Sequence, residues 1–290
     1  MDTGDGMILT FGKTGQVAVE LQRLGGVTAL SRAEADLSDP DACAAAIRAH
    51  APRAVINAAA YTAVDRAEEE EPLATVINGD APAAMARACA DLGVPFLHIS
   101  TDYVFDGSGQ GPWAVDAPVA PLGAYGRSKR VGEAGVRAAG GAHAILRTSW
   151  VFSAHGANFV KTMLRLSETR DALSVVDDQI GGPTPAADIA ATLLAMEAQM
   201  RDGHPGGTYH YGGQPWVSWA RFARETFQLA GRDVTVTGIP SKAYPTPAKR
   251  PLNSRLDGTA LTRDFGITPP DWRTGLARVL DDLGARPAPL

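Results

Sequence analysis

The sequence predicts an α/β fold built on a doubly wound parallel sheet, with a smaller α/β domain interwoven toward the C-terminus. Short apolar runs alternate with helical patterns through the first half of the chain, as in successive β-α units. A glycine-rich turn joins the first apolar run to the first helix. The 290 residues are 45% hydrophobic and 20% charged, which is typical of one large or two modest globular domains.

The predicted elements follow in order along the chain. Buried strands are expected in the first half at residues 7–11, 27–30, 54–57, 96–100 and 143–148. Helices are expected between them at residues 16–23, from Pro40 onward with Asp39 as N-cap, at 72–92 and at 125–139. The second half is less regular, with helices at 159–166, 189–200, 218–229 and 271–283, strands at 173–176 and 208–211, and a Pro-rich loop at 238–251.

Composition and charge argue against several classes of function. Lys and Arg total 27 against 32 Asp and Glu, a net charge of −5 without a basic block, so we expect no nucleic-acid partner. No apolar run approaches the roughly 18 residues of a membrane-spanning helix, and the polar N-terminus does not resemble a secretory signal. Cys43 and Cys89 cannot build a disulfide or zinc framework. We therefore expect a cytoplasmic protein without a membrane partner, either a monomer or a homodimer.

The glycine-rich turn has the spacing of a dinucleotide-binding loop. Gly12, Gly15 and Ala18 form a G-x-x-G-x-x-A pattern between a predicted strand and a predicted helix. Glycines allow a tight turn and a close approach to a pyrophosphate, and the helix N-terminus offers it free N–H groups. The alternative is an ordinary strand-to-helix turn. The residues that we expect to bind the cofactor here are Gly12, Thr14, Gly15, Gln16 and Val17.

The end of the second predicted strand bears on the choice of cofactor. An NAD-selective site has Asp or Glu there, which binds the ribose 2′-hydroxyl. This chain has Ser31 and Arg32, a hydroxyl and a guanidinium that can bind a phosphate. NADPH is therefore the expected cofactor and NADH the alternative, unless Arg32 is merely solvated. Asp36 and Leu37 follow as candidates for the adenine edge. We place the dinucleotide-binding domain at residues 1–150 and expect 171–210 to return to its sheet.

A Tyr and a Lys four residues apart open the helix after the fourth predicted strand. Tyr125 and Lys129 would share one face of that helix. A phenol has a pKa near 10, and a nearby ammonium group lowers that pKa toward the working range of an enzyme. Lys129 is one of only five lysines among the 27 basic residues, which hints at a need for an amine there. The pair alone is a weak signal, and its position strengthens it.

The carboxyl ends of neighbouring strands supply further candidates, because ligands bind there in a doubly wound sheet. Thr101 ends the fourth strand, where its hydroxyl can bond a substrate carbonyl and the Tyr125 oxygen. Strand alternation turns Ser100 to the other side, and His98 is expected to be a packed strand residue. After the third strand, small side chains would let a cofactor lie close to the backbone or simply allow tight packing; the candidates are Ala59, Ala60, Tyr61 and Thr62.

Longer segments resemble a known family. They are GKTGQ (12–16), NAAAYTAVDRAE (57–68), STDYVFDG (100–107), PLGAYGRSK (121–129), RTSWVF (147–152), NFVKTMLRL (158–166), VVDDQIGGPT (175–184) and RPLNSRLD (250–257). Together they are similar to the dTDP-4-dehydrorhamnose reductases, a family of extended short-chain dehydrogenases with a Rossmann-type sheet. The similarity runs over almost the whole chain, and STDYVFDG and RTSWVF are far more specific than the glycine loop.

The resemblance implies an NAD(P)H-dependent oxidoreductase that reduces the C4 keto group of dTDP-4-dehydro-6-deoxy-L-mannose to give dTDP-L-rhamnose. It implies that Tyr125 is the general acid, that Lys129 binds the nicotinamide ribose and tunes Tyr125, and that Thr101 orients the keto oxygen. It also implies that residues 151–290 mainly form a nucleotide-sugar-binding domain. The implied substrate contacts are Thr101, Asp102, Trp150 and Asn158; the alternative for Trp150 is a core tryptophan that caps the sheet.

The chain departs from the family in two places. Some members have an acidic residue where this chain has Ser31, which puts a preference for NADH in doubt. Some members form a Mg²⁺-bridged dimer through a glutamate just after the GxPT segment, and here the matching residue is Ala187, so we predict no metal. The acidic run at 68–71 is expected to be solvated and to start a helix.

Two other functions stay open. One is another nucleotide-sugar enzyme of the same superfamily, a 4-ketoreductase, an epimerase or a 4,6-dehydratase. A dehydratase usually carries Thr-Asp-Glu, and Tyr103 takes the place of that Glu here. The other is a non-catalytic NADP-binding regulatory subunit, like the relative that binds methionine adenosyltransferase. The intact set of Thr101, Tyr125 and Lys129 favours chemistry.

Overall fold

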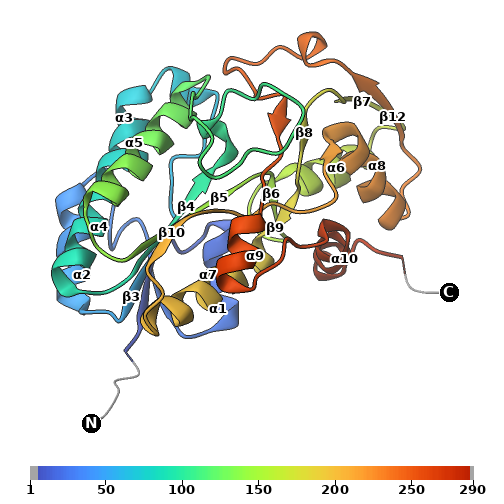
Figure 1. Cartoon of the computed structure of the whole chain (residues 1–290). Coiled ribbons are helices and arrows are strands. Elements are labelled where there is room, and N and C mark those ends of the chain that lie inside the picture. The colour runs from blue at the N-terminus through green and yellow to red at the C-terminus, as the bar shows by residue number, and fades with distance from the viewer. Residues whose placement is uncertain (1–5, 288–290) are drawn as a thin grey trace.

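The computed structural model describes residues 6–287, and a six-stranded parallel sheet forms its centre (Figure 1). The strands lie in the order β10-β5-β4-β3-β1-β2. They are β1 (Ile8–Phe11), β2 (Val27–Leu30), β3 (Ala54–Asn57), β4 (Phe96–Thr101), β5 (His143–Thr148) and β10 (Gly206–His210). The chain steps outward from β1 to β2 and then returns to β3 on the other side of β1, so the sheet is doubly wound as predicted. This reversal creates a crevice at the carboxyl ends of β1 and β3.

Helices cover both faces of the sheet, because successive side chains of a strand point to opposite sides. The flanking helices are α1 (Gln16–Leu24), α2 (Pro40–His50), α4 (Ala81–Leu92), α5 (Ala124–Ala138) and α7 (Ala186–Arg201). Ile8 and Ile56 pack toward α1 and α7, whereas Leu9 and Val55 pack toward α2, α4 and α5. Figure 1 shows these two helical layers. The expected N-cap is confirmed, since the Asp39 side chain accepts the Ala42 N–H.

The helix predicted at residues 72–92 contains a π-helical turn. The segment α3 (Glu71–Thr75) continues through the π-helical η2 (Val76–Asp80) into α4. At this turn the buried Asn78 side chain accepts the Tyr61 N–H at 2.8 Å and donates to the Tyr61 carbonyl at 3.0 Å. It also donates to the Ser128 hydroxyl at 3.0 Å. The π-turn therefore fastens the loop after β3 to α5.

The second half of the chain forms small sheets beside the large one (Figure 1). The paired strands are β7 (Ala172–Val176) with β12 (Thr235–Ile239), β8 (Ile180–Gly181) between β11 (Val217–Ser218) and β13 (Asn253–Ser254), and β6 (Val151–Phe152) with β9 (Thr184–Pro185). The helices around them are α6 (Phe159–Ser167), α8 (Trp219–Leu229), α9 (Thr259–Phe265) and α10 (Trp272–Asp282). Phe152, Phe222 and Trp272 form much of a separate core among α6, α8 and α10.

The expectation that residues 171–210 return to the large sheet is wrong for the first strand of that segment. β10 does pair with β5, but β7 pairs with β12 in a separate two-stranded sheet. In β7, Leu173 is buried whereas Ala172 and Ser174 are exposed. Central strands of a parallel sheet are buried on both faces, so a strand with one exposed face lies at an edge or in another sheet.

Segments after β12 return over the first half, which makes the two halves interwoven. Arg250 pairs with Asp65 at 2.7 Å. Trp113 and Leu256 form an isolated parallel β-bridge, and the Trp113 indole donates to the Asn253 carbonyl at 3.0 Å. The C-terminal part of the chain therefore packs directly against the loops that follow β3 and β4.

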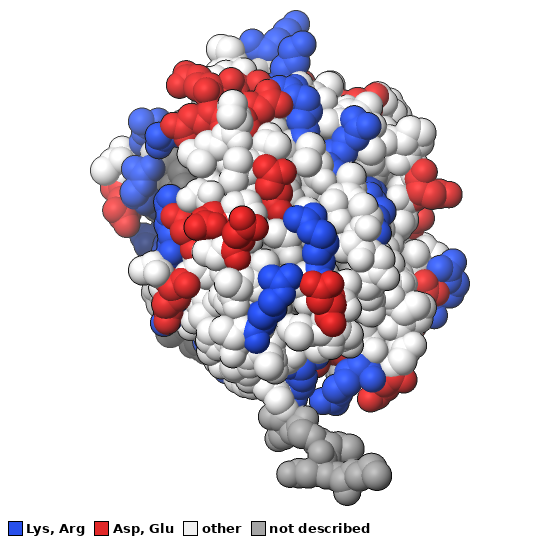
Figure 2. Space-filling model, turned by 90° about the vertical axis from the view of Figure 1, so that its left-hand side faces the viewer, with Lys and Arg blue, Asp and Glu red and all other residues white. Residues whose placement is uncertain are grey.

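The outer surface of the helical layer α2–α5 is polar. Figure 2 shows Lys and Arg interspersed with Asp and Glu over this face, with acidic side chains gathered toward its upper end. Ion pairs such as Arg48–Asp91 and Arg127–Glu71 link neighbouring helices. Between residues 6 and 287 no helix combines the length and apolarity needed to cross a membrane.

Candidate active site

A cavity of about 1030 Å³ opens at the carboxyl ends of β1, β3, β4 and β5. It extends from Ser31, after β2, to Trp150, after β5, so it suits an elongated ligand. Most residues predicted to bind cofactor or substrate line it, namely Gly12, Thr14, Gly15, Gln16, Val17, Ser31, Arg32, Asp36, Leu37, Ala59, Ala60, Thr62, Thr101, Asp102, Tyr125, Lys129 and Trp150. Tyr61 and Asn158 are not in its lining.

The turn between β1 and α1 has free donors and room for a phosphate. Gly12 has a φ of +104°, and a Cβ there would lie 3.3 Å from backbone atoms of Ala58 and Ala59, so the position favours glycine. α1 begins after Gly15 without a side-chain cap and without an acidic residue in its first turn. Its first N–H groups and the positive end of its dipole can therefore bind an anion. These features fit a dinucleotide pyrophosphate.

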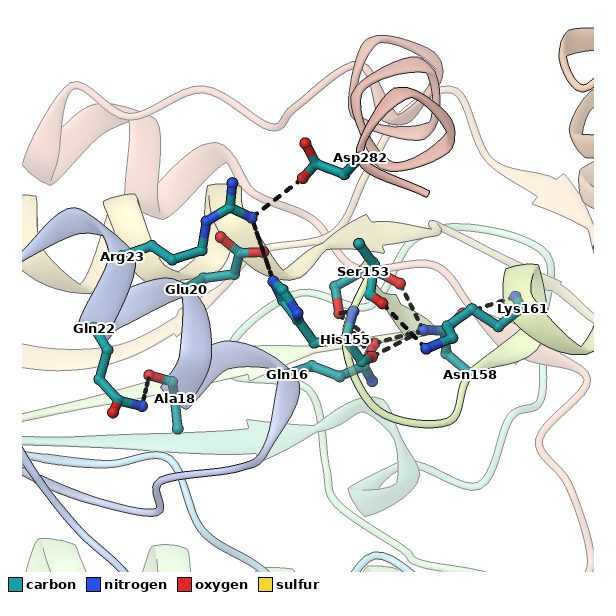
Figure 3. A network of polar contacts seen from close by, with 11 residues as sticks. Gln16, Ala18, Glu20, Gln22, Arg23, Ser153, His155, Asn158, Lys161 and Asp282 are labelled. Carbon is teal, nitrogen blue, oxygen red and sulfur yellow. Dashed lines mark hydrogen bonds and ion pairs between the residues drawn. The ribbon is translucent and has the colours of Figure 1, made fainter. Parts of the chain in front are cut away.

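Gln16 links this turn to the second half of the chain (Figure 3). Its Oε1 accepts hydrogen bonds of 3.0 Å from the Ser153 hydroxyl and from Asn158 Nδ2. Asn158 also donates to the Ser153 carbonyl and accepts the Lys161 N–H as the N-cap of α6. The Asn158 amide therefore holds the loop and caps the helix, and its expected contact with the substrate stays a prediction.

The polar groups of Tyr61 are bonded to other residues of the protein, and its expected contact with the cofactor stays a prediction. Its hydroxyl donates to Glu70 Oε2 at 2.7 Å, a bond that raises the pKa of the phenol. Its N–H and carbonyl are both bonded to Asn78. The ring is held outside the cavity, while the neighbouring Ala60 and Thr62 line it.

Tyr125 and Thr101 meet in the cavity, as predicted. Tyr125 lies in the first turn of α5 and Thr101 ends β4. The Thr101 hydroxyl donates to Asp102 Oδ1 at 3.1 Å. Burial and the charge of Asp102 raise the pKa of Tyr125 to about 12, and the nearby Thr101 hydroxyl opposes this rise. The phenol therefore keeps its proton at neutral pH, the state that a general acid needs.

Lys129 lies one turn along α5 from Tyr125, but the sheet holds its amine. Nζ donates to the Ile99 carbonyl at 2.6 Å and lies 3.2 Å from Nε2 of the buried His98. Burial lowers the pKa of Lys129 to about 8. The expected lowering of the Tyr125 pKa by Lys129 is not seen, because burial and the charge of Asp102 raise that pKa. His98 is the packed strand residue that the sequence predicted.

The lowered pKa of Lys129 sets the expected pH dependence of turnover. The ammonium form is present below about pH 8 and is lost as the pH rises through that value. If the ammonium is required, kcat falls about tenfold per pH unit above that point, whereas the phenol of Tyr125 stays protonated until about pH 12. The check is a profile of kcat at saturating substrates from neutral to alkaline pH. A rate that stays level through this range would show that the ammonium is not needed.

The acidic run at residues 68–71 holds α5 in place and is not merely solvated. Glu68 Oε1 accepts the N–H of Ala124, the first residue of α5, at 2.9 Å. Glu71 starts α3, as expected, and accepts two hydrogen bonds of 2.7 Å from Arg127. The run therefore fixes the end of α5 that carries Tyr125.

Glu68→Ala is expected to lower the free energy of unfolding by about 0.5–2 kcal/mol, the usual cost of a lost helix cap. It is also expected to lower turnover, because Tyr125 follows the capped residue. The measurements are urea denaturation and kcat, beside the control Glu69→Ala. Glu69 is exposed, and its side chain makes no hydrogen bond or ion pair with residues 6–287. Equal effects of the two substitutions would contradict the capping role.

Trp150 forms a wall at the far end of the cavity. Its φ of +50° is unusual for a residue other than glycine and is typical of a functional constraint. Its ring stacks on Trp219 with centroids 3.6 Å apart. A Cβ at Gly181 would lie only 2.7 Å from an atom of the Trp150 ring, so glycine is needed there. Trp219 was not predicted, because its only signal is a place at the start of an amphipathic helix.

The region after the GxPT segment has a structural ion pair. Asp188 lies next to Ala187 in the first turn of α7 and pairs with Arg278 at 2.6 Å. In the described part of the chain, His, Cys, Asp and Glu side chains do not gather in groups of three or more that could hold a metal ion.

Known protein sequences are similar to this chain over almost its whole length. A family model described as the RmlD substrate binding domain matches residues 6–285. The dTDP-4-dehydrorhamnose reductase of Sinorhizobium fredii is 43% identical over 280 residues, which cover 93% of this chain and 95% of the relative. The Escherichia coli K12 protein of the same name is 40% identical over 291 residues, covering 95% of this chain and 97% of the relative.

Solved structures share the fold. The crystal structure of a dTDP-4-dehydrorhamnose reductase from Clostridium acetobutylicum has a TM-score of 0.90 at 37% identity and covers 96% of this chain and 99% of its own. The one from Bacillus anthracis, solved with NADP, has a TM-score of 0.89 at 32% identity with the same coverage. This chain therefore belongs to the RmlD family, whose relatives named here are dTDP-4-dehydrorhamnose reductases with an extended short-chain dehydrogenase fold.

Proposed function

We propose that this protein is a dTDP-4-dehydrorhamnose reductase, an NAD(P)H-dependent oxidoreductase. It reduces the C4 keto group of dTDP-4-dehydro-6-deoxy-L-mannose to give dTDP-L-rhamnose. The observation that carries the proposal is the single cavity in which the dinucleotide loop, Thr101, Tyr125 and Lys129 meet. A carbonyl reductase needs these parts together, because hydride and proton must reach the two atoms of one carbonyl group.

The residues of the cavity divide the work of reduction. When bound, NAD(P)H supplies the hydride for the sugar C4. Thr101 donates a hydrogen bond to the keto oxygen and orients it, and Tyr125 gives its proton to that oxygen as negative charge develops there. Lys129, one helical turn from Tyr125, would hold the nicotinamide ribose.

The two ends of the cavity hold the two ligands. The turn from Gly12 to Val17 would hold the pyrophosphate of the cofactor, and its adenosine would be held by Ser31, Arg32, Asp36 and Leu37. The sugar lies between Tyr125, Asp102 and Trp150. Residues 151–290 form most of the nucleotide-sugar-binding domain, and residues 1–150 form most of the dinucleotide-binding domain. A cytoplasmic location stays a prediction.

The two alternatives differ from this proposal in their chemistry. A 4,6-dehydratase needs a base after Thr101 and Asp102, but Tyr103 stands there and burial raises the pKa of its phenol. A non-catalytic NADP-binding subunit would bind the cofactor without turnover. An epimerase, a 4,6-dehydratase and a non-catalytic subunit would not consume a reduced cofactor in the presence of the 4-keto sugar. Another 4-ketoreductase would consume it, but its product would differ from dTDP-L-rhamnose.

The deciding assay follows the loss of NADPH or NADH absorbance with the 4-keto-6-deoxy sugar nucleotide. The control reaction contains dTDP-glucose, which has no keto group to reduce. We expect the cofactor to be oxidised in the reaction with the keto sugar but not in the control with dTDP-glucose. The product, identified by NMR, is expected to be dTDP-L-rhamnose. Absence of oxidation with both cofactors would eliminate the reductase.

A further inference from the structure

Four charged side chains surround the end of β2, at the adenosine end of the cavity. Lys13 and Arg32 line the cavity, and each is paired with a carboxylate. Lys13 Nζ lies 3.7 Å from Glu34 Oε2, and Arg32 Nε lies 3.0 Å from Asp36 Oδ2. Glu34 Oε2 also accepts the Ser31 N–H at 2.8 Å. The cluster is therefore neutral overall.

A 2′-phosphate would need the donors that these carboxylates already use. The end of the second strand faces the adenosine ribose in folds of this type. A phosphate monoester carries about −1.5 to −2 charges at pH 7 and binds backbone N–H groups and cationic side chains. Glu34 accepts the hydrogen bond from the Ser31 N–H and pairs with Lys13, and Asp36 pairs with Arg32. Hydrogen bonds from Ser31, with the charge of Lys13, lower the pKa of Glu34, so it stays ionised at neutral pH.

The two carboxylates differ in how firmly they are held. Asp36 accepts a second hydrogen bond from the Ser38 N–H at 2.9 Å, which fixes it on its loop. Glu34 reaches Ser31 with a side chain that is 50% exposed and has open solvent beside it. Glu34 is therefore the carboxylate that can leave when a phosphate arrives.

We propose that Glu34 determines the cofactor preference, because its carboxylate occupies the site of the NADPH 2′-phosphate as an internal competitor. NADPH binds after displacing this carboxylate from Ser31 and Lys13, whereas NADH has no phosphate to place there. Ser31 and Arg32 favour NADPH, and Glu34 reduces that preference, so both cofactors are accepted. The inference rests on the proposed function only in requiring that the cavity bind a nicotinamide dinucleotide.

The test compares cofactor affinities without the sugar. Glu34→Gln keeps an acceptor for the Ser31 N–H and removes the charge. The Kd values of NADPH and NADH are measured from the fluorescence of the bound reduced nicotinamide for the wild type, for Glu34→Gln and for the control Glu69→Gln. We expect Glu34→Gln to lower the Kd of NADPH about tenfold and to change that of NADH by less than about twofold. The control changes neither.

A second substitution removes a positive charge instead of a negative one. Arg32→Ala is expected to raise the Kd of NADPH about tenfold and to leave that of NADH nearly unchanged. Equal changes for both cofactors in Glu34→Gln, or no change, would overturn the inference. If Glu34→Gln proves unstable by its Tm, Glu34→Ala provides the same comparison. A selective change in NADPH binding without reduction of the sugar would refute the reaction and leave the role of Glu34 intact.

Discussion

Tyr125→Phe is expected to lower kcat by about 10²- to 10⁴-fold and to leave the Kd of NADPH unchanged. Phe keeps the ring and its edge contact with Tyr103, whose centroid lies 5.4 Å away, so the packing is preserved. The substitution removes the hydroxyl that meets Thr101 in the cavity. The developing alkoxide then has no protein acid beside it, whereas the dinucleotide loop is untouched. The measurements are kcat and a fluorescence titration with NADPH.

A matched control separates this effect from the general loss of a phenol. Tyr244 is 62% exposed and lies far along the chain in the Pro-rich segment, so Tyr244→Phe is expected to match the wild type. A Tyr125→Phe enzyme that turns over at the rate of Tyr244→Phe would eliminate Tyr125 as the acid. Loss of NADPH binding in Tyr125→Phe would point instead to a damaged cavity.

Arg147→Met is expected to lower the free energy of unfolding by about 3–5 kcal/mol. Arg147 on β5 donates hydrogen bonds of 2.8 and 2.7 Å to Glu133 on α5, and both side chains are buried. Ser100 donates to the same carboxylate at 2.6 Å from β4, on the side of the strand opposite to Thr101, as alternation predicted. Met fills a similar volume but leaves a buried carboxylate without its main partner. The same network fixes α5 to the sheet.

The control for this prediction is Arg137→Met, because Arg137 also binds Glu133, at 2.8 Å, but is 43% exposed. Water can replace an exposed partner, so the expected loss is at most about 1 kcal/mol. Urea denaturation measures both variants. Similar losses for the two would mean that burial is not the source of the effect. Although burial alone would raise the pKa of Glu133, Arg147 and the other donors lower it, so the carboxylate is charged in the fold.

The inner strands of the large sheet could be predicted because they are buried on both faces and are mostly apolar. Ala54–Asn57 is such a run, buried throughout. Local signals also placed the helix starts, as with Asp39 before α2. These features depend on residues close together in the sequence, where periodicity and capping act.

The small sheets could not be predicted, because they depend on contacts between distant segments. β8 and β13 have two residues each, and they pair only because the chain brings residues near 180 and 253 together. β7 was recognised as a strand, but nothing near it in the sequence identifies β12 as its partner. In the structure, its residues 172–175 alternate between exposed and buried, as in a strand with one face toward solvent.

In the candidate site too, residues in local sequence motifs could be predicted, whereas most residues that act through distant contacts could not. Gly12, Thr101, Tyr125 and Lys129 were found because each occupies a set place in a motif at the end of a strand or the start of a helix. Asn78 was missed because its role depends on a π-turn against α5, where a Cβ at Gly132 would reach the Asn78 carbonyl. Glu68 and Trp219 likewise act through contacts with distant segments. Glu34 was not singled out, although it accepts the Ser31 N–H in the S-x-x-E spacing of a capping box.

The most direct test of Tyr125 as the proton donor is a crystal structure of the protein with NADP⁺ and dTDP-L-rhamnose. We expect the Tyr125 hydroxyl to lie about 2.6–3.2 Å from the sugar O4, with the nicotinamide C4 about 3–3.5 Å from the sugar C4. A complex in which O4 binds another group, and the phenol points away from both ligands, would contradict the proposed mechanism.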